Sequence, residues 1–339
     1  MAGGRSGRGG RAALVAGAVG AAGVVGAVGA AAAWVARTPD LDGTPTVDLT
    51  RHGFARRDVD TPAGRVAVYE AGTGDPVLLL HGVGGGASSY YWHRIGPELA
   101  RTRRVLAPDW VGFGCSEHPD RPLLFDDYVA QVRALTALTD PAPAVVAQSL
   151  AVGFTIAAVR AGASVRRLAM LAPTGGRDFG EDAFGPVARL TLSPLARSPR
   201  LGPAAYRVLF HRRSAIEGWF RRQGFRDPAA VPAEVVDAGV FSARQPNAAY
   251  AALPFLSGDL RYDLAPLLRD LPVPGLMLWG EQETQIRPSV RERLERVNLA
   301  VPVVRIPGAR SNLELEQPWA TLAALEPFLT VGELSPPTG

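Results

Sequence analysis

Lysine is missing from this chain of 339 residues, so all 36 of its basic side chains are arginines, against 32 acidic ones. A net charge of +4 would suit a nucleic-acid partner if the arginines formed a stripe interleaved with aromatic residues. The sequence has only short pairs, such as Arg212-Arg213 and Arg221-Arg222. We therefore expect no nucleic-acid partner. We attribute the high content of arginine, alanine and glycine to a GC-rich genome.

Cysteine is nearly missing as well, because Cys115 is the only one, and this excludes an intramolecular disulfide. Cys115 follows Gly112-Phe113-Gly114 and has no histidine next to it, so we favour a structural role over a reactive thiol. The sequence also contains no metal-ligand cluster and no phosphate-binding loop. We therefore expect neither a metal nor a cofactor.

The amino terminus carries an uncharged run rich in alanine, glycine and valine over 12–35, preceded by Arg5, Arg8 and Arg11. A helix needs about 20 apolar residues to cross a bilayer, so this run is long enough. The arginines favour an amino end in the cytoplasm and a globular part on the far side. We expect residues 1–36 to be a basic flank and a membrane-anchor helix.

Two alternatives to the anchor remain. A cleaved signal peptide would leave a secreted protein, although its apolar part is normally about 7–15 residues, shorter than this run. A soluble Ala/Gly tail would leave a cytoplasmic protein, because alanine is only mildly hydrophobic.

Beyond a linker expected over 37–58, short apolar runs typical of buried strands alternate with helical patterns. The strands are expected at 65–69, 77–80, 105–107, 145–147, 168–171, 276–279 and 303–306. The helices are expected at 125–138, 150–161, 289–297 and 318–328. This alternation predicts an α/β fold with a mostly parallel, doubly wound sheet.

One long segment, 175–262, breaks this alternation, since it has no strand pattern and is rich in Arg, Pro, Phe and Ala. It is far longer than an ordinary connection between a strand and a helix. We expect it to be a helical cap over the carboxyl edge of the sheet, where such folds bind ligands. The core then consists of 59–174 and 263–331, with a disordered tail over 332–339.

The most informative site is Ser149, in Ala147-Gln148-Ser149-Leu150-Ala151, between an expected strand and an expected helix. A serine at such a corner has its hydroxyl clear of the sheet, beside the N–H groups that open the helix. This geometry suits a nucleophile. The alternative is that Ser149 only caps the helix, and the glycines that usually flank the nucleophile are alanines here.

A glycine turn, His81-Gly82-Val83-Gly84, follows another expected strand. Its glycines would let the backbone N–H of Val83 face a developing oxyanion, with the N–H of Leu150 as the second donor. The alternative is a plain turn. For Asp109, at a third strand end, we favour a structural role in organising its loop.

Three blocks, HGVGGGASSYYW, APDWVGFGCSEHP and VVAQSLAVG, resemble in this order the successive motifs of the α/β-hydrolase superfamily. The similarity covers roughly 60–330 and includes a helical cap, as in esterases, haloalkane dehalogenases and epoxide hydrolases. The last two groups use Asp as the nucleophile, whereas this chain has Ser149. The resemblance therefore implies ester-type acyl chemistry, in which serine works with a histidine base and an acid.

The acid is implied by Leu278-Trp279-Gly280-Glu281-Gln282-Glu283, which resembles the W-G-x-x-D block of the family. This resemblance assigns the acid to Glu283, because a glutamate can also accept a hydrogen bond from imidazole. Asp178 is an alternative acid.

The base is where the chain departs from the family, whose last strand leads into G-x-x-H followed by L-E-x-P. The corresponding segment here is GARSNLELEQP, over 308–318, and Ser311 occupies the histidine position. Serine cannot act as a general base near pH 7, and Arg310 stays protonated. Other histidines are candidates, above all His93 near the pocket mouth and His211 in the cap. The full set is His52, His81, His93, His118 and His211.

Two functions follow from this combination. The first is a serine-type hydrolase acting on a small or lipid-like ester, with Ser149 as nucleophile and an unidentified base. The second is a degenerate member that keeps the pocket and binds an apolar ligand or a protein partner. A third possibility is that the anchor and the cap together form a membrane-facing entrance for lipids.

Overall fold

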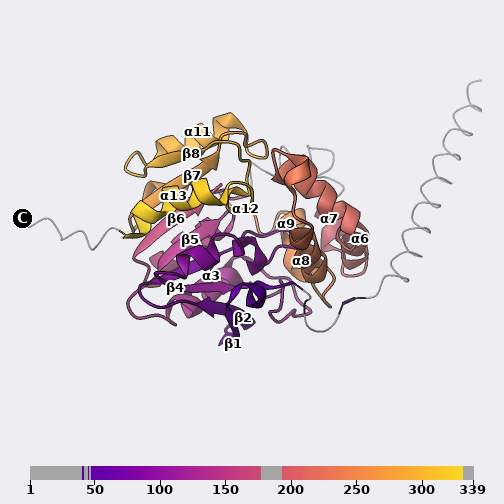
Figure 1. Ribbon diagram of the computed structural model, residues 1–339. Helices are drawn as coiled ribbons and strands as arrows, with labels where there is room; N and C mark the ends of the chain where they lie inside the picture. The colour runs from indigo at the N-terminus through magenta and orange to yellow at the C-terminus, as the bar shows by residue number, and fades with distance from the viewer. Residues whose placement is uncertain (1–39, 42–44, 46, 177–192, 331–339) are drawn as a thin grey trace, which may run out of the picture. The chain divides into compact units, whose positions relative to one another are not determined.

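The computed structural model describes residues 40–41, 45, 47–176 and 193–330 (Figure 1). The expected anchor over 1–36, the alternative acid Asp178 and the tail over 332–339 lie outside these residues. None of the helices that the structure describes is both long and apolar enough to span a bilayer. The membrane anchor therefore stays a prediction.

Eight strands in the described part form one sheet, in the order β1-β2-β4-β3-β5-β6-β7-β8 (Figure 1). The pairs β1–β2 and β2–β4 are antiparallel, and all other neighbours are parallel. The bounds are β1 Ala55–Thr61, β2 Gly64–Ala71, β3 Pro76–Leu80, β4 Arg104–Pro108, β5 Ala144–Gln148, β6 Arg167–Leu171, β7 Gly275–Gly280 and β8 Val303–Ile306. The predicted mostly parallel, doubly wound sheet is confirmed.

Strand β1 was missed, because it begins inside the segment 37–58 that the sequence suggested to be a linker, as does the short helix η1 (Leu49–His52). Its sequence, ARRDVDT, is mostly charged and mostly exposed. An edge strand with one neighbour tolerates such residues, and charges there discourage pairing with other chains. Two ion pairs with β2, Arg57–Glu70 at 3.0 Å and Asp58–Arg65 at 3.5 Å, help to hold it.

Every residue of the central strands β3, β5 and β6 is buried, and all but Gln148 and Arg167 at the strand ends are apolar. Such strands need helices on both faces. Helix α3 packs against α4, and α13 packs against β6 and β8. The helices of the core are α2 Gly96–Leu99, α3 Phe125–Thr136, α4 Ala151–Arg160, α10 Ala265–Arg269, α11 Pro288–Val297, α12 Leu313–Glu316 and α13 Pro318–Thr330, with the 3-10 helix η2 Ser89–Trp92. All four helices expected from the sequence are present.

Between β6 and β7, the described part of the insertion is helical, as predicted. Its elements are α6 Leu201–Phe210, α7 Arg213–Trp219, the π-helical turn η3 Phe220–Gly224, η4 Pro228–Ala230, α8 Ala233–Ala243 and α9 Ala249–Ser257.

The glycine-rich stretch after β3 provides the contact surface for this cap. A Cβ atom at Gly85 would lie 2.3 Å from the ring of Phe210, and one at Gly86 would lie 2.6 Å from the carbonyl oxygen of Gly239. The hydroxyl of Ser242 donates to the carbonyl of Ala87 at 2.7 Å. These glycines therefore let the cap approach the backbone closely, which is a role that the sequence did not assign to them.

Candidate active site

Ser149 lies between the end of β5 and the start of α4, with φ at 57°. This left-handed conformation costs a non-glycine residue about 1–2 kcal/mol, and such strain is concentrated at functional sites. A backbone hydrogen bond from the N–H of Ser149 to Leu171 on β6, 2.9 Å long, helps to fix it. The N-cap residue of α4 is Leu150, and no side chain caps the helix. The alternative that Ser149 serves as a helix cap is therefore wrong.

The turn after β3 touches this serine corner. A Cβ atom at Gly82 would lie 3.2 Å from the Cβ of Ser149 and 3.3 Å from Oε1 of Gln148. Val83 follows Gly82, and Leu150 follows Ser149. The hydrogen bonds between described residues use neither the N–H of Val83 nor that of Leu150. Both N–H groups are therefore candidate donors to a ligand oxygen.

Glu283 and Ser311 meet at the other side of the site, in the loops after β7 and β8. The hydroxyl of Ser311 donates to Oε2 of Glu283 at 2.5 Å. The other oxygen of Glu283 accepts backbone N–H groups of Gln285 at 2.5 Å and Ile286 at 3.2 Å. The buried carboxylate is thus aimed at position 311, where the family pattern has the histidine.

Two histidines, His81 and His118, form hydrogen bonds to the backbone of the glycine turn and of the loop after β4. His81 is buried, its Nδ1 lies 2.7 Å from the carbonyl of Gly82, and its Nε2 accepts the N–H of Trp110. Burial lowers the pKa of His81 to about 4. His118 bonds the carbonyl of Gly114 at 3.3 Å, and burial likewise lowers its pKa to about 4.

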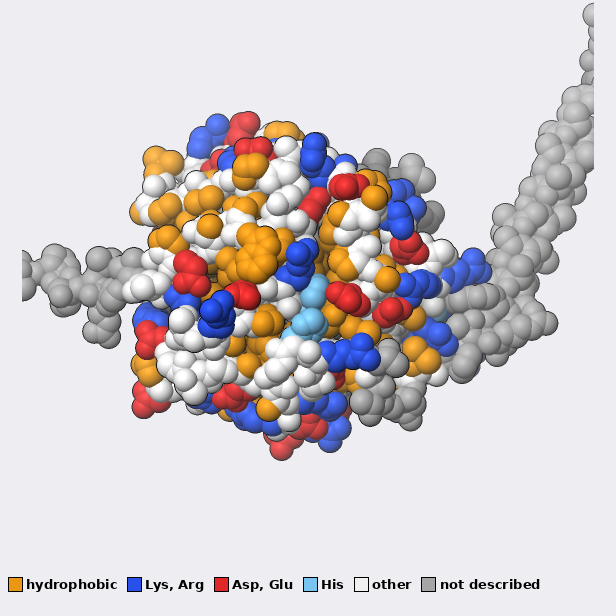
Figure 2. Space-filling view, viewed as in Figure 1, with side chains coloured by type: hydrophobic (Ala, Val, Ile, Leu, Met, Phe, Trp, Pro, Cys, Tyr) orange, Lys and Arg blue, Asp and Glu red, His pale blue; other side chains and the backbone are white. Residues whose placement is uncertain are grey.

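The remaining histidines lie where the core adjoins the cap or in the cap itself. His52 and His93 gather around Tyr90, and His93 lies 3.6 Å from Glu234 of α8. Figure 2 shows histidine side chains at the surface of this face, among acidic and basic ones. His211 packs edge-on against Tyr206. Among the residues described, no histidine hydrogen-bonds the Ser149 hydroxyl.

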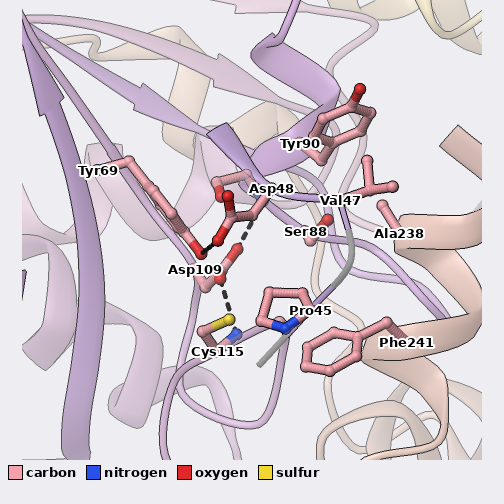
Figure 3. A pocket seen from close by; sticks show the side chains of 12 residues that line it. Pro45, Val47, Asp48, Tyr69, Ser88, Tyr90, Asp109, Cys115, Ala238 and Phe241 are labelled. Atoms are coloured by element: carbon pink, nitrogen blue, oxygen red, sulfur yellow. Dashed lines mark hydrogen bonds between the residues drawn. The ribbon is translucent and has the colours of Figure 1, made fainter. Parts of the chain in front are cut away.

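Asp109 has the structural role expected of it. Its carboxylate accepts the N–H groups of Ser89 at 2.7 Å and Cys115 at 2.8 Å. Figure 3 shows it beside Tyr69, Asp48 and Cys115 around a cavity of about 10 Å³, room for about one water molecule. Burial, reinforced by the charge of Asp109, raises the pKa of the Cys115 thiol to about 12. The thiol therefore stays protonated, which agrees with a structural role.

A buried network that the sequence did not reveal lies under the serine corner. Gln148 donates from Nε2 to Asn312 at 3.2 Å and to Glu314 at 2.9 Å, and its Oε1 accepts the N–H of Gly82 at 3.1 Å. Glu314 is completely buried, and burial raises its pKa to about 8. Glu314 comes just before the L-E-x-P stretch over 315–318, and nothing in this position of the sequence indicates burial.

Tyr262 is a second residue that the sequence analysis missed. Its hydroxyl donates to the carbonyl of Leu150 at 2.6 Å and accepts the N–H of Gly153 at 3.1 Å. A Cβ atom at Gly153 would lie 2.3 Å from the tyrosine ring. Tyr262 therefore holds the first turn of α4, and the glycine at 153 was the one visible sign of this close contact.

The cap is fastened over the loop that carries Ser311. Asn312 donates to the carbonyl of Gly224 at 3.2 Å, and Arg310 donates to that of Arg222 at 2.7 Å. The backbone N–H of Arg226 donates to the carboxylate of Glu316. The turn η3 therefore packs on this loop. No group of three or more His, Cys, Asp or Glu side chains in the described ranges could hold a metal ion.

Comparison with known proteins shows which family this chain resembles. The model of the alpha/beta hydrolase family matches residues 77–325. A 2-hydroxymuconate semialdehyde hydrolase of Pseudomonas sp. (strain CF600) is 36% identical over 123 residues, which are 35% of this chain and only 44% of that relative. The chain thus spans less than half of that relative.

Longer matches cover most of the chain. Haloalkane dehalogenase 2 of Mycobacterium tuberculosis (strain ATCC 25618 / H37Rv) is 28% identical over 84% of this chain and 98% of its own length. The crystal structure of carboxylesterase CesB from Bacillus subtilis superposes with a TM-score of 0.66 at 18% identity, covering 82% of this chain and 92% of the esterase, and so shows a shared fold. The chain belongs to the α/β-hydrolase family.

Proposed function

We propose that this protein is a serine-type hydrolase of its family that binds a small or lipid-like carboxylic ester, and that Ser149 attacks it slowly. The observation that carries the proposal is the left-handed backbone of Ser149, at φ 57°, beside the two unused N–H groups of Val83 and Leu150. A strained serine next to free backbone donors suits acyl transfer. The similarity of this chain's fold to that of a carboxylesterase supports an ester as the substrate class.

In the proposed reaction, Oγ of Ser149 forms a bond to the ester carbonyl carbon, and the oxyanion accepts hydrogen bonds from Val83 and Leu150. Collapse of this intermediate breaks the bond to the alkoxy group, which leaves as the alcohol. Water must take the serine proton and supply the proton of the alcohol, because no imidazole in the described part of the chain hydrogen-bonds the serine. Water then hydrolyses the acyl-enzyme.

The Glu283–Ser311 pair limits this reaction. A carboxylate that orients an imidazole stabilises the imidazolium formed during attack, and a serine hydroxyl cannot take up that proton. In serine hydrolases, loss of a triad member leaves about 10³–10⁴-fold catalysis over water, from the oxyanion donors and binding. We therefore expect this protein to hydrolyse its ester only about 10³–10⁴-fold faster than water alone does.

The same pair favours a second candidate function, in which the protein binds an apolar ligand or a protein partner without converting it. The 2.5 Å bond from Ser311 satisfies the Glu283 carboxylate without any histidine. Such a closed arrangement suits a site that no longer turns over.

A fluorophosphonate probe separates the two candidates, because it reacts covalently with an activated serine whatever the natural substrate is. We expect stoichiometric labelling that the Ser149→Ala variant abolishes. Ser311→Ala is the matched control, since it removes a neighbouring hydroxyl and should still be labelled. Well-folded protein that stays unlabelled even after exposure long enough for the slow reaction expected without a base would contradict the first candidate and support the second.

We also propose that residues 12–35 anchor the protein in a membrane, with the globular part outside the cytoplasm. The support is the length of the uncharged run and the three arginines before it. A phosphatase fused to the carboxyl end should be active outside the cytoplasm. Activity found only inside would overturn this orientation.

A further inference from the structure

A carboxyl group lies buried below the serine corner, and the proposed reaction does not use it. Glu314 belongs to the short helix α12 and is 0% exposed. Its Oε1 accepts a hydrogen bond from Nε2 of Gln148 at 2.9 Å. Its Oε2 has no hydrogen-bond partner among the described residues.

The surroundings of Glu314 favour its neutral form. Tyr91 of η2 is itself buried and interacts electrostatically with Glu314. On α12, the nearby carboxylate of Glu316 disfavours a negative charge on Glu314. The guanidinium of Arg94 reaches only the backbone carbonyl of Leu315, at 3.4 Å.

The other elements packed against α12 contribute uncharged groups. The hydroxyl of Thr321 on α13 donates to the carbonyl of Leu313 at 3.0 Å, and Gln148 comes from β5. No cation among the described residues acts on the Glu314 carboxyl. A buried carboxylate in such surroundings is costly, so the group takes up a proton instead. The rise of its pKa to about 8 has this cause.

The carboxamide of Gln148 connects Glu314 to the oxyanion turn. Both hydrogens of its amide nitrogen are used, toward Asn312 at 3.2 Å and Glu314 at 2.9 Å, so its oxygen is left to accept the N–H of Gly82 at 3.1 Å. Loss of the Glu314 acceptor would free the amide to rotate. Gly82 would then lose the acceptor that holds it, and Val83 is the next residue in the turn.

We propose that Glu314 is a positioning residue for the oxyanion turn: its neutral carboxyl holds the Gln148 amide, which fixes the N–H of Gly82 and so the direction of the Val83 N–H. This inference rests on the proposed function of Ser149. An ionised Glu314 would have to admit water or move α12 outward, and either change disturbs the bonds that orient Gln148.

The test compares the rate of Ser149 labelling by a fluorophosphonate in the wild type and in Glu314→Gln from pH 6.5 to 9. The variant keeps a neutral acceptor of the same shape at all these pH values. We expect the ratio of the variant rate to the wild-type rate to be near one at pH 6.5 and about tenfold at pH 9, since about nine-tenths of a group with pKa 8 is then ionised. A ratio that does not change with pH would overturn the proposal.

Two further variants complete the comparison. Glu314→Leu removes the acceptor and should slow labelling about 10- to 100-fold at pH 6.5, less than the roughly 10²–10³-fold cost of removing an oxyanion donor outright. Glu98→Gln removes a half-buried carboxyl that pairs with Arg101 at 3.2 Å and does not bond Gln148, and it should leave the rate ratio flat across the pH range. A pH-dependent ratio in Glu98→Gln as well would overturn a specific role of Glu314.

Hydrogen exchange provides a readout that does not need a reactive serine. In the wild type, exchange of the Gly82 N–H should accelerate above pH 8 relative to Glu314→Gln, after correction for the intrinsic pH dependence. If the probe labels neither protein, the proposed function fails, and exchange still decides on Glu314. Identical Gly82 exchange in both proteins would contradict the positioning role.

Discussion

The two halves of the candidate site depend on different features of the structure, one on backbone conformation and the other on a single side chain. The nucleophile half, with Ser149, Gly82 and the start of α4, depends on backbone conformation at the ends of completely buried strands. The other half, with Glu283 and Ser311, lies after β7 and the edge strand β8, three of whose four residues are not buried. Its chemistry depends on the side chain at one position. In the proposed function, the fold keeps the backbone conformation of the nucleophile, whereas Ser311 stands where the family pattern has the base.

The largest effect is expected from restoring a histidine to the half of the site that contains Glu283 and Ser311. The Glu283 carboxylate now accepts a hydrogen bond of 2.5 Å from the Ser311 hydroxyl. Ser311→His puts an imidazole at this position, within reach of the same carboxylate. We expect ester hydrolysis to rise about 10²–10⁴-fold, the range of general acid–base catalysis. Turnover of a short-chain nitrophenyl ester measures this.

The control for this repair is the double variant Ser311→His with Glu283→Gln, which should lose most of the gain because the imidazole is no longer oriented by a carboxylate. If Ser311→His folds but hydrolyses no faster than the wild type, the nucleophile half has lost its catalytic geometry too.

The second effect concerns stability on the nucleophile side. The pKa of Glu314 in the folded protein, about 8, is above its ordinary value of 4.5, so the fold favours the protonated form. Its share of the free energy of unfolding is therefore complete below pH 4.5 and is lost as the pH rises toward 8, by up to about 5 kcal/mol. Chemical denaturation from pH 5 to 9 measures this decline.

The comparison variant is Glu314→Gln, which cannot ionise and should show a smaller decline over the same range. Equal declines in both proteins would mean that Glu314 does not titrate in this interval.

A third, smaller effect tests the support of α4. Tyr262→Phe removes the hydroxyl bonded to Leu150 and Gly153 while the ring stays in place. The lost bonds leave buried backbone groups unpaired, so we expect a loss of about 1–3 kcal/mol in the free energy of unfolding, measured by urea denaturation. Tyr250→Phe, in helix α9, is a control that should change the stability less. Equal losses would contradict a special role of Tyr262.

The smallest effect has the opposite sign. Ser149→Gly should stabilise the protein by about 0.5–1 kcal/mol, because glycine adopts φ 57° without the penalty that a Cβ atom brings, offset in part by its greater entropy when unfolded. Thermal unfolding measures the gain. Ser149→Ala loses the same hydroxyl but keeps the Cβ, so it should show no such increase. An equal increase in both variants would attribute the effect to the hydroxyl and not to backbone strain.

Much of the fold was predictable because buried strands and amphipathic helices have repeating patterns. The runs at 77–80, 145–147 and 168–171 lie within β3, β5 and β6. Strand β1 escaped prediction because an edge strand can be mostly charged, as this one is. The role of Gly85 and Gly86 also escaped, because only the position of Phe210 and Gly239 explains why no side chain fits there.

For the candidate site, the sequence alone predicted the serine corner, the glycine turn, the carboxylate Glu283 and the absence of a histidine at position 311, since each belongs to a local motif at a strand end. Only the tertiary structure decided that Ser311 bonds Glu283, that no described histidine hydrogen-bonds Ser149, and that Gln148, Glu314 and Tyr262 support the serine corner. The physical reason is distance along the chain: Gln148 and Glu314 are 166 residues apart, and their bond exists only once the sheet is assembled. Local patterns specify backbone turns, whereas contacts between loops depend on the whole fold.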